Sequence, residues 1–136
     1  MNIQPYARPV QQQLEIYRKE YSRVRAQLQK VGFIFRGSLT QRRLPCGNPN
    51  CRCRQRKHWH GPYYQISWKQ KGKTVSRFLP ARTIPAYREW LANGRTLRAI
   101  LEKMNRISHH VADVIQAAEA TRGQLKKAQK GARKVT

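Results

Sequence analysis

The chain has 136 residues, and its 29 Lys and Arg against six Asp and Glu give a formal net charge of +23. A mean hydropathy of −0.83 and 39% hydrophobic residues allow only a thin core, in one compact domain or a small domain with long helical arms. No apolar run approaches the ~20 residues that span a bilayer, and the N-terminus lacks the apolar stretch of a signal peptide. We therefore expect a cytoplasmic protein with no membrane partner.

The positive charge is concentrated in one part of the sequence. No carboxylate occurs between Tyr21 and Arg88, while sixteen Lys and Arg lie in that stretch. An ordinary solvated surface mixes charges of both signs, and a one-sign surface repels itself unless a polyanion binds it. Nucleic acid is the commonest polyanionic partner, and it is the one that this composition favours.

The first predicted element is an amphipathic helix from about Val10 to Val31. Pro9 suits the first helical turn, and Gly32 marks the end. Apolar residues recur at alternating spacings of four and three, at Val10, Leu14, Tyr17, Tyr21, Val24, Leu28 and Val31. A stripe this narrow predicts packing on another helix, either of this chain or of a second copy.

Three strands are predicted next. The segment from Phe33 to Arg42 has β-branched and aromatic character, and the segments 63–69 and 74–79 alternate on either side of a Gln70-Lys71-Gly72-Lys73 turn. The expected fold class is therefore α+β, with a three-stranded antiparallel sheet over residues 33–82 and a cysteine-rich loop inserted between its first two strands. One face of the sheet should pack on helices, and the other should present Arg, Lys, Ser and Gln.

A long second helix is predicted from residue 83 to about Thr121, following the N-terminal helical segment 1–32 and the sheet segment. Its coiled-coil-like stripe comprises Tyr87, Trp90, Gly94, Leu97, Leu101, Met104, Ser108, Val111, Ile115 and Ala118, widened by Leu91, Ile100, Ile107 and Val114. Asn93-Gly94 can kink it. Residues 122–136 carry six cations and no acid, which is typical of a basic tail.

The cysteine-rich loop predicts a metal site. All three cysteines, Cys46, Cys51 and Cys53, fall within eight residues, and His58 and His60 follow closely. An odd number of tightly spaced cysteines suits metal binding better than disulfide formation. Three thiolates and one imidazole can hold Zn²⁺ in a tetrahedron. His60 is the preferred fourth ligand because it directly precedes Gly61-Pro62; His58 is the alternative.

A saturated Cys3His site leaves no open position for water, so we expect a structural metal and no catalysis. The acids are scattered over the helices, and no phosphate-binding glycine loop is present. Tyr63 or Tyr64 could act as a recombinase nucleophile, but the His/Arg/Lys set that a recombinase needs is missing. Three reduced cysteines in a turn are the simpler alternative to a metal site.

The run Gly37-Ser38-Leu39, Arg42-Arg43, Cys46-Gly47-x-Pro49-x-Cys51-x-Cys53 and His60-Gly61-Pro62-Tyr63 resembles an uncharacterised family of small prokaryotic proteins. That resemblance implies a metal-binding knuckle and no known activity. The order of three strands and a helix is also similar to the arm-type DNA-binding domains of tyrosine recombinases, which lay the sheet in the major groove.

We expect a DNA-binding accessory protein of a mobile element or recombination system, associated with the nucleoid. An RNA-binding subunit of a ribonucleoprotein is the alternative, and a protein-binding scaffold is a third class. The helices are expected to pair with a second copy or a larger protein partner. The expected nucleic-acid contacts are Arg36, Arg42, Arg43, Arg52, Arg54, Arg56, Lys57, Lys69, Lys71, Lys73, Arg77, Trp59 and Tyr63.

Overall fold

A computed structural model describes residues 1–135 and confirms the α+β class, with an N-terminal helix, a three-stranded antiparallel sheet and a long C-terminal helix. The described chain forms two compact units. We call residues 1–30 together with those from 98 onward the helical unit, and residues 31–97 the sheet unit.

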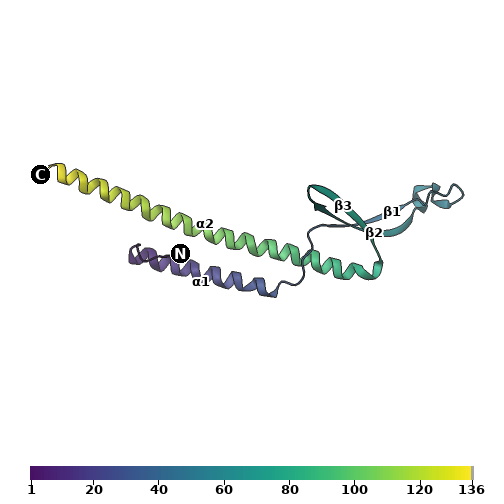
Figure 1. The fold of residues 1–136 in the computed structure, drawn as a ribbon, viewed down its shortest axis with the longest axis horizontal. Helices are drawn as coiled ribbons and strands as arrows, with labels where there is room; N and C mark the ends of the chain where they lie inside the picture. Colours follow the sequence, from purple (N-terminus) through teal and green to yellow (C-terminus); the bar gives the residue numbers. More distant parts are fainter. Residues whose placement is uncertain (136) are drawn as a thin grey trace. The chain divides into compact units, whose positions relative to one another are not determined.

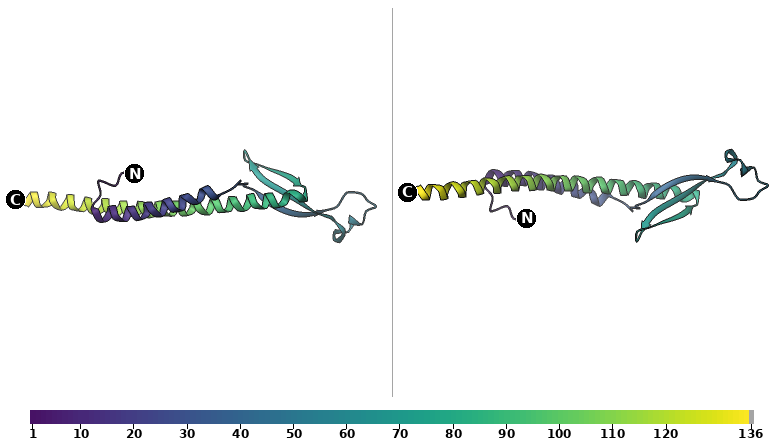
Figure 2. Two further views of the ribbon diagram at one scale, coloured as in Figure 1. Left: turned by 90° about the horizontal axis from the view of Figure 1, so that it is seen from below. Right: turned by 90° about the horizontal axis from the view of Figure 1, so that it is seen from above.

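In the helical unit, helix α1 (Arg8–Ala26) lies alongside the later part of helix α2 (Ile84–Val135) (Figures 1 and 2). The predicted stripe on α1 is confirmed at its centre, where Leu14 is fully buried and Val24 is 8% exposed. On α2, Ile100 and Ile107 fill the interface. Their burial stabilises the unit by about 1.5–3 kcal/mol per side chain.

The helix boundaries differ from the predicted ones. Helix α1 ends at Ala26 and is followed by the 3₁₀ turn Gln27–Lys30, so Val31 lies outside it. Helix α2 is unbroken and continues through residues 122–135, which the sequence predicts as a separate tail; Thr136 lies outside the described residues. The α2 stripe is also turned, because Ile100 is 4% exposed while the predicted Leu101 is 49% exposed.

The sheet has the predicted order β1-β2-β3, formed by β1 (Ser38–Leu44), β2 (His60–Gln70) and β3 (Lys73–Leu79) (Figure 1). Lys71 and Gly72 connect β2 to β3 and have φ values of 52° and 77°. Positive φ at both central residues is the signature of the type I′ turn, whose twist matches that of the two strands. The ladder register therefore follows from this turn.

The two faces of the sheet differ in chemistry. Register pairs place Leu39 and Arg77 on either side of Ile66, which is fully buried, so these residues share the inner face. The outer face carries Thr40, Ser67 and Ser76 among other polar residues, and the Ser67 and Ser76 hydroxyls are 2.8 Å apart. One covered and one open face were predicted from the alternation of β2.

The segment 31–37 corrects the predicted first strand, which was expected to begin at Phe33. This segment pairs with α2 instead, since the Phe35 backbone N–H donates to the Trp90 carbonyl at 3.1 Å. The Phe35 ring meets Trp68 and Tyr87 edge-on at 5.5 and 5.7 Å. Aromatic packing on a helix therefore outweighs the β propensity of the segment.

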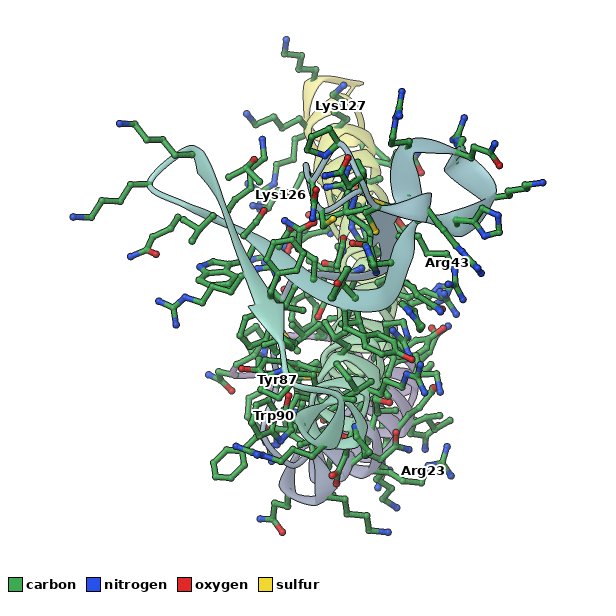
Figure 3. The ribbon with its side chains drawn as sticks, turned by 90° about the vertical axis from the view of Figure 1, so that its right-hand side faces the viewer. Arg23, Arg43, Tyr87, Trp90, Lys126 and Lys127 are labelled. Carbon is green, nitrogen blue, oxygen red and sulfur yellow. The ribbon has the colours of Figure 1, made fainter. Side chains whose placement is uncertain are left out.

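The sequence predicts a possible kink at Asn93-Gly94, but α2 is continuous there and the pair contacts the segment 31–37 instead. The Asn93 side chain donates from Nδ2 to the Phe33 carbonyl at 2.8 Å. Gly94 is buried, and a Cβ placed on it would lie 3.3 Å from the Phe35 carbonyl oxygen. The two residues thus allow the segment 31–37 to approach an intact helix closely. Figure 3 labels Tyr87 and Trp90, which belong to the same packing region.

We predict that Asn93→Ala destabilises the sheet unit relative to Asn105→Ala, an exposed asparagine in the same helix. Both changes gain the same helix propensity, but only the first removes a hydrogen bond, so the two should differ by about 1 kcal/mol. Urea unfolding followed by tryptophan fluorescence measures the difference. Equal midpoints would show that the Asn93–Phe33 bond contributes nothing.

Candidate metal centre and basic surface

The ends of two paired strands bring the cluster together. Cys46 follows β1 by two residues and His60 is the first residue of β2, while Leu44 pairs directly with His60. Between them the chain forms a turn at Asn48–Cys51 and two 3₁₀ turns, Arg52–Arg54 and Arg56–His58. Strand pairing thus fixes both ends of the loop, which we call the knuckle (residues 45–60).

The ligand atoms of Cys46, Cys51, Cys53 and His60 all lie within 4.8 Å of one another. The Cys46 and Cys53 sulfurs are 3.4 Å apart, and the Cys51 sulfur is 3.2 Å from His60 Nε2. All three cysteines are free thiols. Thiolates about 2.3 Å from a tetrahedral metal ion stand roughly 3.7 Å apart, so the four atoms could hold one ion.

Cys51 and His60 form the most polarised pair of the cluster. The pKa of the Cys51 thiol is lowered to about 6 by a hydrogen bond from the Cys53 backbone, then by the Cys53 and His60 side chains. The pKa of His60 is raised by the Cys51 sulfur and next by that of Cys46. The two pKa shifts have opposite directions because a thiolate and a protonated imidazole stabilise each other, and a metal ion bound at His60 Nε2 would replace the proton on that nitrogen.

The other two sulfurs have different surroundings. A hydrogen bond from the Asn48 backbone lowers the pKa of Cys46, which is exposed. The Cys46 backbone N–H lies 3.3 Å from the Cys53 sulfur and favours its thiolate, but burial and the neighbouring sulfurs outweigh it and raise the Cys53 pKa. Cys53 is only 2% exposed. A bound cation would favour all three thiolates at once.

Gly61 allows the close approach of the two strands beside His60. Its φ is +129°, and a Cβ placed on it would lie 2.9 Å from the Arg42 carbonyl oxygen. Any other residue would strain the backbone and push β1 away from β2. The Arg43 guanidinium donates to the Gly61 carbonyl at 3.3 Å, which further ties the end of β1 to the start of β2.

The two candidate histidines have separate places. The structure brings His60 into the cluster, whereas His58 is exposed and outside it. His58 lines an open hollow of about 600 Å³ on the knuckle together with Cys51, Arg52, Arg54 and Gln55. The preference for His60 as the fourth ligand therefore agrees with the grouping that the structure shows.

Basic side chains surround the cluster. Arg52 and Arg54 lie on the first 3₁₀ turn, and Arg56 and Lys57 lie on the second; all four are exposed. The Arg56 guanidinium lies 5.3 Å from the centre of the Trp59 ring, which is half-buried. Three sulfurs and a run of cations thus share one loop, and the cations offset the negative charge of the thiolates.

The remaining predicted contact residues are dispersed over the sheet unit. Lys71 and Lys73 lie at the β2–β3 turn, and Lys69 and Arg42 lie on the outer face, where Arg42 donates to the Gln65 side chain at 3.1 Å. Arg77 does not share that face. It is paired with Ile66 on the inner side, and its guanidinium lies 5.3 Å from the centre of the Trp68 ring. Arg36 is exposed in the segment 31–37.

One exposed aromatic residue, Phe78, was not included among the predicted contacts, although its neighbour Tyr63 was. Tyr63 and Phe78 lie on the outer face with ring centres 6.3 Å apart, and they are 43% and 58% exposed. The alternation of β3 already places Phe78 with Thr74 and Ser76, away from the core. A large apolar residue on a polar strand face was therefore the available signal.

The sheet unit carries fourteen Lys and Arg and a single acid, Glu89. All fourteen cationic side chains are exposed, and no ion pair forms among residues 31–97, every one of which is described. A cationic surface of this density is stable only when counterions or a polyanionic partner screen it.

The fold and the site define a small α+β protein with a cluster of three cysteines and one histidine that could bind a metal ion. The chain belongs to a family described as a domain of unknown function (DUF6788), which matches residues 9–89. No curated protein and no solved structure shows a significant match. Among the described helices, none is long and apolar enough to cross a membrane.

Proposed function

We propose that this protein binds nucleic acid without catalysing a reaction, and that DNA is its principal partner. The observation that carries the proposal is the sheet unit, with fourteen exposed cations and one carboxylate. Such a surface supplies the phosphate contacts that account for most affinity in protein–DNA complexes. An accessory role in a mobile element or recombination system, in the cytoplasm at the nucleoid, is the context that we propose.

We propose zinc as the metal of the cluster. Three soft thiolates and an imidazole favour Zn²⁺ over harder cations such as Mg²⁺ and Ca²⁺, which prefer oxygen ligands. Four protein ligands saturate a tetrahedral ion, so such an ion would have a structural role. The Gly47 φ of +79° and the 3₁₀ turns allow the compact loop that this coordination needs.

The knuckle and the β2–β3 turn are the proposed contact regions. Most of their Arg and Lys would bind phosphates, and one or two arginines could contact guanine bidentately in the major groove. The likeness to the arm-type domains of tyrosine recombinases supports DNA, because those domains use a three-stranded sheet for the same purpose. That likeness concerns the arrangement of elements alone.

We also propose that the helices bind a second copy of the chain or a larger protein. Ile16 and Leu101 are 65% and 49% exposed on α1 and α2, although both are large apolar residues on amphipathic helices. Covering such side chains on association is favourable in proportion to the apolar area buried.

The salt dependence of DNA affinity tests the main proposal. Replacing Arg52, Arg54 and Arg56 together by Gln should lower the slope of log K against log salt by about 2.7, from ~0.9 per lost phosphate contact. The matched control replaces Arg8, Arg23 and Arg25 on α1, which lowers the net charge equally. Fluorescence anisotropy with a labelled duplex measures both. If the two triple variants lose the same slope, net charge alone drives binding and the knuckle has no specific role.

An RNA-binding subunit of a ribonucleoprotein is the second candidate, favoured by the exposed Tyr63–Phe78 pair. Aromatic rings on an open polar sheet face can stack on unpaired bases, which single-stranded loops of RNA supply. The Phe78 ring, 58% exposed, is available for such a contact.

Competition at equal salt distinguishes the two candidates. If DNA is the partner, duplex DNA should displace structured RNA, and Phe78→Ala should leave duplex binding unchanged. If RNA is the partner, Phe78→Ala should weaken RNA binding by about 5- to 150-fold, corresponding to 1–3 kcal/mol per stacked base. Phe33→Ala, which removes an 82% exposed ring from the segment 31–37 and leaves the outer face of the sheet intact, serves as the control.

A further inference from the structure

The last turns of α2 carry a one-sided cationic surface. Taking 100° per residue, six basic residues between positions 122 and 134 fall within an arc of about 140°. They are Arg122, Lys126, Lys127, Lys130, Arg133 and Lys134, which we call the basic arc. The rest of the helix circumference holds Gln124, Leu125, Ala128, Gln129, Gly131 and Ala132, of which Ala128 and Ala132 lie directly opposite the arc. This separation exists only because the segment is helical, and it lies outside the residues that match the family.

The turns after Leu125 extend past the packing of the helical unit. Near the N-terminal end of α1, Pro5, Tyr6 and Val10 line a hollow together with Ala118, Arg122 and Leu125. Every residue from Glu119 to Lys134 is exposed. Figure 2 shows the C-terminal end of α2 continuing beyond the start of α1, and Figure 3 labels Lys126 and Lys127 on these turns.

The helical conformation of these turns has little stability of its own. Short unpacked helices are marginal in water, and Gly123 and Gly131 lower the helix propensity further. Arg122, Lys126, Lys130 and Lys134 also follow one another at the i,i+4 spacing, where like charges repel. An anionic partner along this side would remove the repulsion and stabilise the helix.

We infer that the basic arc is a second DNA-binding surface, which contacts the phosphate backbone of duplex DNA independently of the knuckle. The arc spans about 18 Å along the helix axis, and a duplex presents one charge per ~1.7 Å over that length. An α-helix fits the major groove of B-DNA. An anionic membrane is the weaker partner, because the rest of the helix circumference offers a single large apolar residue, Leu125.

The experiment uses the full-length chain and two double variants of equal net charge. Lys126→Gln with Lys130→Gln removes two cations from the arc, while Ala128→Glu with Ala132→Glu adds two anions on the opposite side; each lowers +23 by two. The first should reduce the slope of log K against log salt by about 1.8 for a 30-base-pair duplex. The second should leave the slope within experimental error. Circular dichroism checks that both variants keep their helix.

Equal slope losses in the two variants would overturn the inference, because net charge alone would then explain binding. An unchanged slope in the Lys126 and Lys130 variant would overturn it as well. The inference would also be overturned if the Lys126 and Lys130 variant kept its DNA affinity and lost only its binding to vesicles that contain anionic lipid, because the arc would then be a membrane-binding surface. The inference rests on the proposed function only in sharing DNA as partner. The Arg52, Arg54 and Arg56 variant tests the knuckle separately, so either surface can fail while the other stands.

Discussion

The sheet unit holds three sulfurs and an imidazole within 4.8 Å of one another on a strongly cationic surface, and we propose that the arrangement of the unit depends on this cluster. Apart from the aromatic packing of Phe35 on α2, the unit has a small core, in which Ile66 and Ile84 are the deeply buried aliphatic side chains. Burying each contributes about 1.5–3 kcal/mol, whereas a structural zinc ion contributes about 10–16 kcal/mol to the folding of small zinc-binding peptides. On these magnitudes, a zinc ion at the cluster would be the largest single stabilising term.

The charge of a metal-loaded cluster and the charge of the neighbouring cations would offset each other. Three thiolates around a divalent ion leave a formal charge of about −1, which the adjacent arginines offset. Arg52 and Arg54 lie on a 3₁₀ turn that contains Cys53 and directly follows Cys51, so an ion bound at the cluster would fix their positions. Fixed cations bind a phosphate backbone at a lower entropic cost than flexible ones.

Much of this architecture could be predicted from the sequence because it depends on local patterns. Spacings of three and four predicted both helices, alternation predicted β2 and β3, and cysteine density predicted the ligand set. The wrong predictions concern residues whose structure is determined by packing against distant segments of the chain. Phe35 is strand-like locally, yet its backbone hydrogen-bonds to Trp90 of α2. Leu101 fits the heptad pattern as well as Ile100, and only the packing of α1 against α2 places Ile100 inside.

Treatment with a chelator tests the central claim most directly, that a metal ion at the cluster stabilises the surface that we propose binds DNA. The protein should be purified without chelator, its zinc content measured by mass spectrometry, and its duplex DNA affinity compared before chelation, after it, and after zinc is restored. The account predicts about one zinc ion per chain, loss of DNA affinity on chelation, and recovery with zinc. DNA affinity that persists unchanged in the metal-free protein, at the same salt concentration, would contradict it.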